Sequence, residues 1–275
     1  MVETKWFAVA FGIVLSMWRI VPTILVCGWM AVSAQESTSA NPEVTISTDR
    51  PAVSSSSVAV PQGGLQVENG MAATNQQGQY LLDLPESLVR FGLLKKTELR
   101  LSVPDYYHNF ATGGAASSGF GDVALGMKQQ IGPLGGFDVS AIFYVSFPTG
   151  ANGVSSHGYD PALQIPWTRK ISENWTAGGQ VAFYWPTQGG KRSFTGQTAF
   201  FLDRQLRKPW DAFLEYAGDF PERGGSRQQI HAGMAYKITR RQQIDFHFAF
   251  GLTAAAPKGY VGMGYSFLLL TKGEK

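Results

Sequence analysis

Hydrophobic and polar residues alternate along most of the chain beyond Gly64. The stretch QIDFHFAFGL (243–252) shows this clearly, because Phe246 and Phe248 fall on one face while Asp245 and His247 fall on the other. Alternation with a period of two residues predicts a β-strand with two chemically different faces. The fold and the function both depend on which of these faces meets water.

Similar segments, each of about 8–12 residues, follow one another almost to the end of the chain. An even number of segments of this length is typical of tilted transmembrane strands. We expect about twelve of them, at 65–73, 79–93, 97–107, 119–131, 137–147, 157–171, 175–185, 194–206, 210–220, 228–239, 242–252 and 260–268.

The links between these segments alternate in length from the second segment onward. One set is short: LKK (94–96), GPLGG (132–136), SEN (172–174), RKP (207–209) and a tight turn at Arg240–Arg241. The other set is longer and rich in glycine: HNFATGGAASS, PTGANGVSS, PTQGGKRS, PERGGSR and TAAAPKG. This alternation predicts an outer-membrane barrel with short periplasmic turns and longer external loops.

The two faces of the segments agree with this prediction. Trp175 and Trp210 fall at expected periplasmic ends and Trp185 at an external end, as an aromatic girdle requires. The opposite faces carry charged and amide side chains that could not form a dry core, so the phenylalanines are expected to face lipid. We therefore predict an all-β fold, an antiparallel transmembrane up-and-down β-barrel of about 12 strands over residues 65–270, followed by a tail at 271–275.

The first 64 residues read differently. Residues 1–34 contain two apolar runs split by Arg19 and end in AVSA, which predicts export with cleavage after Ala34. Together with the predicted barrel, this signal places the protein in the bacterial outer membrane. Met17 opens a tidier signal and is the expected start of translation; an uncleaved anchor helix is the alternative. Cys27, the single cysteine, lies within this signal. Residues 35–64 are rich in Ser, Thr, Pro and Gly and are predicted to form a polar periplasmic or luminal leader.

Composition narrows the possible partners. Only 16% of residues are charged, against about 25% in soluble proteins, and the net charge is +3, which gives no support for nucleic-acid binding. The expected partners are outer-membrane lipids, the barrel-assembly machinery during insertion, and a small-molecule solute. No cofactor is expected.

Four segments resemble a known family: TDRPAVSSSSVAVPQGGLQVENG (48–70), LVRFGLLKKTELRLSVPDY (88–106), GFGDVALGMKQQIG (119–132) and VSFPTGANG (145–153). They are similar to bacterial outer-membrane barrels described as transporters of the phenol-degradation meta pathway. The resemblance covers nearly the whole mature chain, and its most specific piece is GDVALGMK. It implies a Gram-negative outer-membrane barrel that passes aromatic or other small organic compounds, and it supplies no substrate-binding residues. One departure is the tail LLLTKGEK after Phe267, where such chains often end on an aromatic residue.

A barrel of twelve strands would be about 24 Å across its backbone and leave a pore of at most about 10 Å. Acids outnumber bases on the predicted inner face, which would favour cations or neutral solutes over anions. The alternative is that these charges pair across the lumen; for example, a three-residue turn at 240–242 would set Lys237 opposite Asp245. The candidate pore-lining residues are Arg90, Arg100, Asp122, Lys128, Tyr184, Glu215, His231, Lys237, Asp245 and His247.

Neither a metal site nor a catalytic site is expected. In the register assumed above, His247 would lie opposite Ala235 and His231 opposite Gly251, too far apart to share an ion. The loop SSHGYDP gathers Ser155, Ser156, His157 and Asp160, but neighbours on an extended chain point apart.

The predicted function is therefore passive passage of small organic compounds, aromatic ones among them, through a polar lumen gated by external loops or by the leader. Two alternatives stay open. One is a closed structural barrel with a filled lumen that displays its loops, and the other is an outer-membrane lipid hydrolase.

Overall fold

The computed structural model of the protein describes residues 44–110 and 118–270. The predicted signal at 1–34, the leader up to residue 43, residues 111–117 of one predicted external loop and the tail at 271–275 lie outside the described residues. Among the residues described, no helix is long and apolar enough to cross a membrane.

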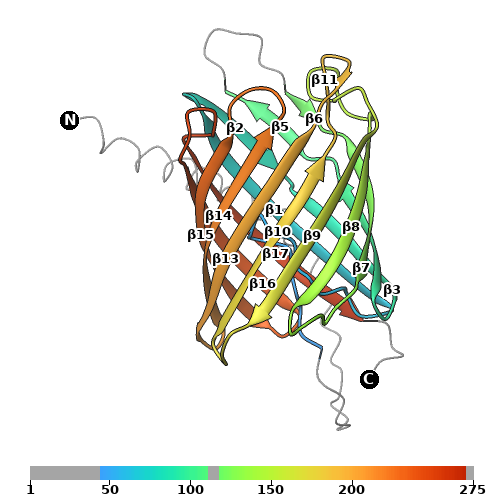
Figure 1. Cartoon of the computed structure of the whole chain (residues 1–275), viewed down its shortest axis with the longest axis vertical. Coiled ribbons are helices and arrows are strands. Elements are labelled where there is room, and N and C mark those ends of the chain that lie inside the picture. Colours follow the sequence, from blue (N-terminus) through green and yellow to red (C-terminus); the bar gives the residue numbers. More distant parts are fainter. Residues whose placement is uncertain (1–43, 111–117, 271–275) are drawn as a thin grey trace, which may run out of the picture. The chain divides into compact units, whose positions relative to one another are not determined.

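The described chain forms a closed antiparallel β-barrel, which confirms the predicted fold and its twelve wall strands (Figure 1). Three wall strands are each built from two shorter pieces, β2 with β3, β4 with β5, and β6 with β7. The wall consists of β1 (Gly64–Gln76), β2 (Gln79–Leu84), β3 (Ser87–Leu94), β4 (Thr97–Val103), β5 (Tyr106–Asn109), β6 (Gly119–Phe120), β7 (Val123–Gln130), β8 (Asp138–Phe147), β9 (Asp160–Lys170), β10 (Trp175–Tyr184), β13 (Thr195–Arg207), β14 (Trp210–Pro221), β15 (Arg227–Thr239), β16 (Gln242–Gly251) and β17 (Gly259–Leu270).

The first and last strands close the barrel. β1 pairs with β17 over its whole length, from Gly64 opposite Leu270 to Asn75 opposite Gly259. On its other edge β1 pairs with β3 near its start and with β2 near its end. Because β1 is paired on both edges, the described membrane-spanning strands satisfy their backbone hydrogen bonds within the sheet, as a hydrocarbon environment requires.

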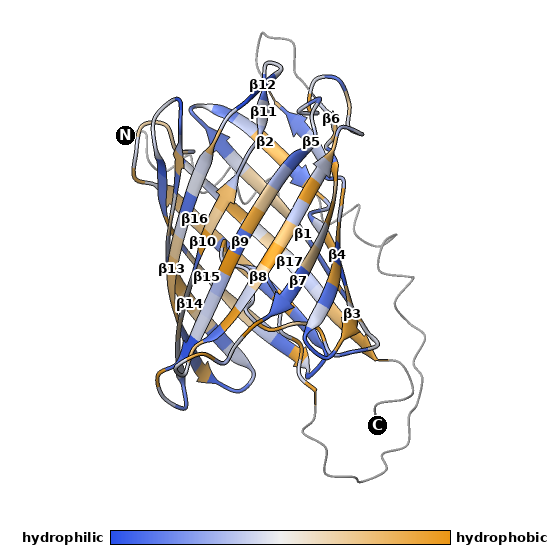
Figure 2. Ribbon diagram, turned by 45° about the vertical axis from the view of Figure 1, so that its right-hand side comes forward, coloured by the Kyte–Doolittle hydropathy of each residue, from blue (hydrophilic) through white to orange (hydrophobic). Residues whose placement is uncertain are grey.

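Side chains of the wall alternate between lipid and lumen. Phe246 is 50% exposed and Phe250 is 60% exposed on the outside, whereas Arg90, Lys128 and Glu215 on the inside are fully buried. Hydrophobic and hydrophilic positions accordingly alternate along the strands (Figure 2). The answer to the question raised by residues 243–252 is therefore that the phenylalanines face outward and Asp245 faces inward.

The predicted sorting of the links is also present. Turns at one end are short, such as residues 95–96, 208–209 and 240–241, and links at the other end are longer. One long link carries a small hairpin of its own, β11 (Thr187–Gln188) and β12 (Lys191–Arg192). An exception at the long-link end is the two-residue turn Gln77–Gly78 between β1 and β2. By the rule for outer-membrane barrels, the short turns mark the periplasmic end and the long loops the external end.

Three segments predicted as continuous strands are interrupted, at residues 85–86, 104–105 and 121–122. Pro85 and Pro104 lie at the first two interruptions. Proline has no backbone N–H to donate to a sheet, which accounts for the loss of pairing there.

The described part of the leader, residues 44–63, does not belong to the wall. It lies inside the barrel (blue in Figure 1) and forms no strand with it. Ile46 and Val60 pack against Leu268 near the periplasmic end of β17, and the Ile46 N–H donates to the carbonyl of Arg240 in a periplasmic turn. The leader therefore occupies the lumen from its periplasmic side.

Candidate functional site: a lumen crossed by the leader

Hydrogen bonds and ion pairs join the leader to nearly the whole circumference of the wall. Since the strands involved lie on opposite sides of a closed barrel, the leader crosses the lumen rather than following one wall. The wall residues that contact it are Glu68 on β1, Arg90 on β3, Glu98 and Arg100 on β4, Lys128 and Gln130 on β7, Ser140 on β8, Gln164 and Thr168 on β9, Gln180 on β10, Glu215 on β14, and Gln243, Asp245 and His247 on β16.

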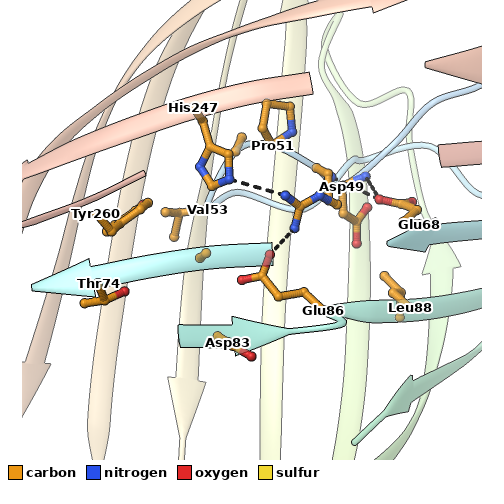
Figure 3. Close-up of a pocket in the computed structure, with 13 residues that line it drawn as sticks. Asp49, Pro51, Val53, Glu68, Thr74, Asp83, Glu86, Leu88, His247 and Tyr260 are labelled. Atoms are coloured by element: carbon orange, nitrogen blue, oxygen red, sulfur yellow. Dashed lines mark hydrogen bonds and ion pairs between the residues drawn. The ribbon is translucent and has the colours of Figure 1, made fainter. Parts of the chain in front are cut away.

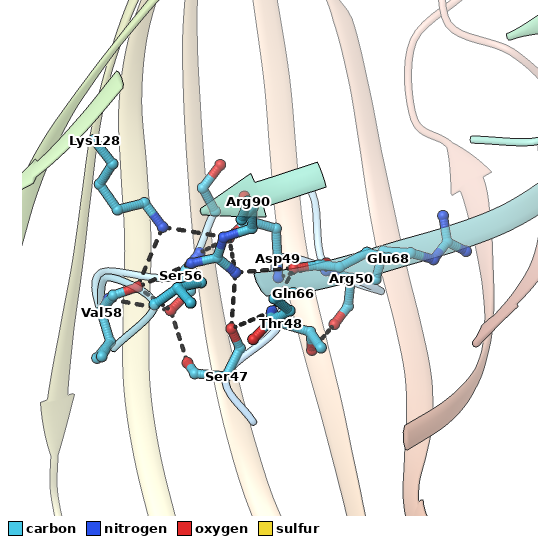
Figure 4. A network of polar contacts seen from close by, with 12 residues as sticks. Ser47, Thr48, Asp49, Arg50, Ser56, Val58, Gln66, Glu68, Arg90 and Lys128 are labelled. Atoms are coloured by element: carbon cyan, nitrogen blue, oxygen red, sulfur yellow. Dashed lines mark hydrogen bonds and ion pairs between the residues drawn. The ribbon is translucent and has the colours of Figure 1, made fainter. Parts of the chain in front are cut away.

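A buried network of six charges holds the leader at Asp49. Figure 4 shows the part of it around Asp49, Glu68, Arg90 and Lys128. The wall supplies three cations and two anions. Arg90 bonds to Glu68 at 2.9 Å and to Glu98 at 2.8 Å, and Arg100 bonds to Glu98 at 2.5 Å. Lys128 lies 3.4 Å from Glu98. The wall alone therefore leaves one positive charge uncompensated in the lumen.

Asp49 of the leader supplies the missing negative charge. Its carboxylate accepts a hydrogen bond from Arg100 and lies 3.3 Å from Arg90 and 3.5 Å from Lys128. Burial alone would raise the pKa of Asp49, but the charges of Arg100, Lys128 and Arg90 outweigh burial and hold that pKa well below its usual range. Docking of the leader thus balances the charge of the lumen. Glu68 also holds the leader backbone, because its carboxylate accepts hydrogen bonds from the N–H groups of Asp49 and Arg50 at 2.9 and 3.0 Å.

A second carboxylate, Glu215 of β14, holds the next part of the leader. Its two oxygens accept the backbone N–H groups of Val53 and Ser54 at 2.7 and 3.0 Å and the Ser54 hydroxyl at 2.7 Å. His231 Nδ1 lies 2.9 Å from the same carboxylate. Glu215, predicted to line a pore, therefore anchors the leader and is fully buried by it.

Further along, the serine run of the leader follows the opposite wall. Ser55 N–H donates to Gln180 at 3.0 Å, and the hydroxyls of Ser57 and Thr168 lie 2.6 Å apart. The Ser140 hydroxyl donates to the Ser57 carbonyl. Small hydroxyl side chains let the backbone approach the wall closely, which explains why a serine run suits this position.

The β15–β16 register differs from the expected one, so two predictions were wrong. Asp245 lies opposite Ala235, and Lys237 lies opposite Gln243. Lys237 instead pairs with Asp211 on β14, at 2.9 Å. The cause is a two-residue turn at 240–241 combined with a bulge between Lys237 and Thr239, which shifts each pairing by two residues relative to a plain three-residue turn.

The same shift brings the two histidines together. His247 lies opposite Gly233 and His231 opposite Ala249, so the two rings are diagonal neighbours on the inner face. His231 Nε2 lies 3.0 Å from His247 Nδ1, contrary to the expectation that they lie several residues apart. Among the described residues, no three His, Cys, Asp or Glu side chains are grouped so that they could hold a metal ion.

Two cavities lie between the leader and the external ends of the strands. One, of about 310 Å³, is lined by Arg50, Asp83, Glu86, His247 and Tyr260 among others (Figure 3). The other, of about 430 Å³, has Tyr144, Tyr184, Trp185 and Gln164 in its wall. Asp49 and Leu88 line both cavities. The leader therefore forms the floor of an external vestibule.

The remaining predicted residues lie in or near this vestibule. Tyr184 lines the larger cavity and donates its hydroxyl to Gln197 at 3.2 Å. Asp122 accepts the N–H groups of Gly150 and Ser156 at 2.8 and 2.9 Å and so fixes an external loop. In that loop His157 Nε2 contacts the carbonyl of Asn152 at 3.1 Å, and the residues gathered by SSHGYDP form no nucleophile–base pair in the structure.

Asp49 and Arg50 were missed by the sequence reasoning, which treated the leader as a uniform polar segment. They are the only charged residues between positions 44 and 63. Two adjacent charges in an otherwise neutral segment, next to a barrel predicted to have charges inside, were the available signal.

The fold and the crossed lumen define a class of protein, outer-membrane β-barrels with an internal N-terminal segment. The sequence matches the model of the family described as "Putative MetA-pathway of phenol degradation" over residues 48–269, and the chain belongs to that family, which confirms the resemblance noted above. The match begins within the leader, so the luminal segment is part of the family's pattern.

Solved structures with the same fold are distant in sequence. The COG4313 outer membrane channel from Pseudomonas putida F1 superposes with a TM-score of 0.57 at 13% identity, covering 77% of this chain and 97% of that one. The NanC porin superposes with a TM-score of 0.52 at 10% identity, covering 74% and 98%. Among curated proteins, none matches this sequence.

Proposed function

We propose that the protein is an outer-membrane channel for passive entry of small organic compounds, aromatic ones among them, and that the leader is its gate. The observation that carries the proposal is the external vestibule whose floor is the leader. A solute can enter the two cavities from the outside, and the leader lies across the remaining path to the periplasm. The names of the structural neighbours, a channel and a porin, support the same class of function.

The larger cavity indicates which solutes suit the vestibule. A volume of about 430 Å³ falls within the range of small-molecule sites. Tyr144, Tyr184 and Trp185 offer aromatic surface, and Gln164 and Ser102 offer polar groups. Arg100, the cation of this cavity, is already paired with Asp49 and Glu98, so an anion gains little there. These features favour a neutral compound with one ring and one or two hydroxyl groups. The family's description, which refers to phenol degradation, supports this class.

A permanently closed structural barrel is the second candidate, and the buried charge network favours it. Buried charges that are fully paired hold a segment firmly, because separating them leaves uncompensated charge. The two candidates differ in one property. A gate must leave the lumen reversibly under native conditions, whereas a structural plug stays in place.

Flux measurements separate these candidates. The protein is reconstituted into liposomes, and entry of phenol and of a sugar of similar size is compared with entry through a variant that lacks residues 44–60. The proposal predicts measurable phenol entry through the intact protein and faster, less selective entry through the deletion variant. Tyr184→Ala serves as the cavity variant and Tyr80→Ala, outside the two cavities, as its control. Equal phenol entry into protein-free liposomes and liposomes with the intact protein would contradict a channel role.

A further inference from the structure

We propose that His231 and His247 form a proton-binding site whose occupation releases the leader from the wall, so that acidification favours the open state of the gate. The proposal concerns a second property of the segment described above and rests on the proposed gating role of the leader. It is carried by a continuous chain of three contacts that begins on a wall carboxylate and ends on a leader side chain.

The chain runs from Glu215 through both rings to Arg50. His231 Nδ1 lies 2.9 Å from Glu215 Oε2, and His231 Nε2 lies 3.0 Å from His247 Nδ1. His247 Nε2 lies 3.3 Å from Nη2 of Arg50 (Figure 3). The outer two nitrogens, His231 Nδ1 and His247 Nε2, face Glu215 and Arg50. The inner two, His231 Nε2 and His247 Nδ1, face each other, and their roles follow from those of the outer two.

The two ends assign every proton. Ionised Glu215 only accepts hydrogen bonds, so His231 must donate from Nδ1. Nη2 of Arg50 only donates, and it shares its two N–H groups among His247 Nε2, the Met263 carbonyl at 3.1 Å and Asp245 Oδ1 at 3.4 Å, so the contact with His247 is favourable when Nε2 carries no proton and accepts. The remaining contact is satisfied when His247 Nδ1–H donates to His231 Nε2. Both rings are then neutral, and all three contacts pair one donor with one acceptor.

One additional proton has no place in this chain. On His247 it occupies Nε2 and faces the N–H of Arg50. If the additional proton is on His231, it occupies Nε2 and faces the Nδ1–H of His247. If His247 then moves its own proton from Nδ1 to Nε2, the Nε2–H of His247 faces Arg50. Every arrangement sets two donors against each other, and a positive ring would also lie beside the guanidinium charge. Moving Arg50 away removes the conflict, and Arg50 is part of the leader.

The surroundings hold these groups in place. Arg50 lies against Gly70 of β1 and Gly264 of β17, which face each other across the closing strand pair. A Cβ added at Gly70 would lie 2.2 Å from Arg50 Cζ, and one at Gly264 would lie 2.4 Å from Arg50 Nε. A Cβ at Gly262 would lie 2.3 Å from His247 Nε2. Glycine at these three positions makes the room that the Arg50–His247 contact needs.

The charged and titratable groups around the rings come from several elements. Arg50 also pairs with Glu86 at 2.5 Å and lies 3.4 Å from Asp245. Tyr260 packs with its ring centroid 5.5 and 5.7 Å from the two histidine rings. The groups facing the histidines directly or through Arg50 are Glu215 of β14, Asp245 of β16, Tyr260 of β17, Glu68 of β1, Glu86 between β2 and β3, and Arg50 itself.

The direction of the pH effect follows from counting protons. The docked state disfavours an additional proton on either ring, because that proton would face Arg50 or the neighbouring ring, and release of the leader removes this conflict. The released state therefore binds more protons, and lowering the pH favours it. Between pH 7.5 and pH 5.0 the ratio of released to docked leader should rise about thirtyfold for each imidazole proton that is taken up only on release.

A spin label on the leader tests this. Cys27 is the only cysteine and lies in the segment expected to be removed on export, so Val58→Cys gives a unique attachment point on an exposed leader residue. The mobile and immobile components of the spectrum are measured for protein in detergent, in a fixed urea concentration that shows both components at pH 7.5. The expected result is a mobile-to-immobile ratio at least thirtyfold higher at pH 5.0.

Histidine variants assign the effect. His231→Gln and His247→Gln should each reduce the rise, and the double variant should show none. His108→Gln and His157→Gln replace the other two histidines of the chain and should leave the rise unchanged. A pH-independent ratio in the unaltered leader, or a rise that persists in the double variant, would overturn the proposal.

A second measurement covers the case in which the double variant does not dock. The ring protons of His231 and His247 are followed by NMR in protein whose leader is tied to the wall by Ser57→Cys and Thr168→Cys. With the disulfide closed the pair of rings should take up less proton between pH 7.5 and pH 5.0 than after reduction; equal proton uptake in both forms would refute the proposal. Because neither readout uses solute flux, release without flux would count against the channel role alone.

Discussion

Replacing Asp49 by asparagine removes one charge from the lumen and leaves the shape of the leader nearly unchanged. In the docked state Arg90, Arg100 and Lys128 would then share only Glu68 and Glu98, so one buried positive charge loses its partner. In the released state these cations meet water in both proteins. The substitution therefore acts on docking rather than on the folding of the wall.

The size of the effect follows from the burial of the partners. Arg90 and Lys128 are fully buried, and Asp49 is 13% exposed. Removing one partner of a buried ion pair costs about 3–5 kcal/mol. Since about 1.4 kcal/mol corresponds to a factor of ten, Asp49→Asn should raise the ratio of released to docked leader roughly a hundredfold to several thousandfold.

Proteolysis of the leader measures this ratio. Residues 44–63 contain several alanine and valine residues at which elastase cleaves, and cleavage follows the released population when docking is fast. Asp49→Asn should be cut faster by the factor given above, while the barrel keeps its resistance to denaturation by detergent. Ser55→Ala is the matched control, because it removes one neutral hydrogen bond, to Gln164, and should cost only about 0.5–1.5 kcal/mol. Equal cleavage of Asp49→Asn and the unaltered protein would refute the reasoning.

Three further predictions concern the leader and the wall. Gly92→Ala would place its Cβ 1.9 Å from the Pro61 carbonyl oxygen, so it should increase elastase cleavage of the leader, whereas Gly196→Ala, whose Cβ would meet nothing closer than 3.9 Å, should not. Phe246→Arg should lower the free energy of unfolding in lipid by about 2–4 kcal/mol, and Ile238→Arg near the periplasmic end by at most about 1 kcal/mol; equal losses at the two positions would contradict the assigned depth. The pKa of Asp49 is depressed in the docked state, so the contribution of Asp49 to docking is fully present above about pH 4 and is lost as the pH falls through the docked pKa. A spin-labelled leader should therefore show an additional release below about pH 4, and this release should be missing in Asp49→Asn.

Much of the barrel could be predicted because a strand in a membrane obeys a strict rule. Side chains must alternate between lipid and lumen, and residues such as Phe246 and Asp245 record that alternation directly in the sequence. The lengths of the links then identify the two ends. The exact register is a different matter, because a single bulge near Thr239 moves Lys237 away from Asp245 and brings His231 to His247. A bulge depends on local geometry that the pattern of apolar residues does not encode.

For a related reason, the sequence predicted the wall residues of the site but not the leader residues that contact them. Alternation places Arg90, Arg100, Lys128 and Glu215 on the inner face, and the structure finds them there. The groups that complete their pairing, the Asp49 carboxylate and the backbone N–H groups of Val53 and Ser54, lie on the leader. The leader has no periodic pattern because it forms no regular element. Contacts of an irregular segment follow from three-dimensional complementarity, and the balance of charge between Asp49 and the wall cations appears only once the lumen is closed.

The measurement that tests the gating claim most directly is single-channel conductance of Ser57→Cys/Thr168→Cys in a planar bilayer. The two hydroxyls that these cysteines replace lie 2.6 Å apart, so a disulfide can join leader and wall in the docked position. The account predicts current steps under reducing conditions, their loss on oxidation and their return on renewed reduction, with each single-cysteine variant unaffected. Conductance that is the same in the oxidised and reduced double variant, with the disulfide shown to be closed, would contradict a gate formed by the leader.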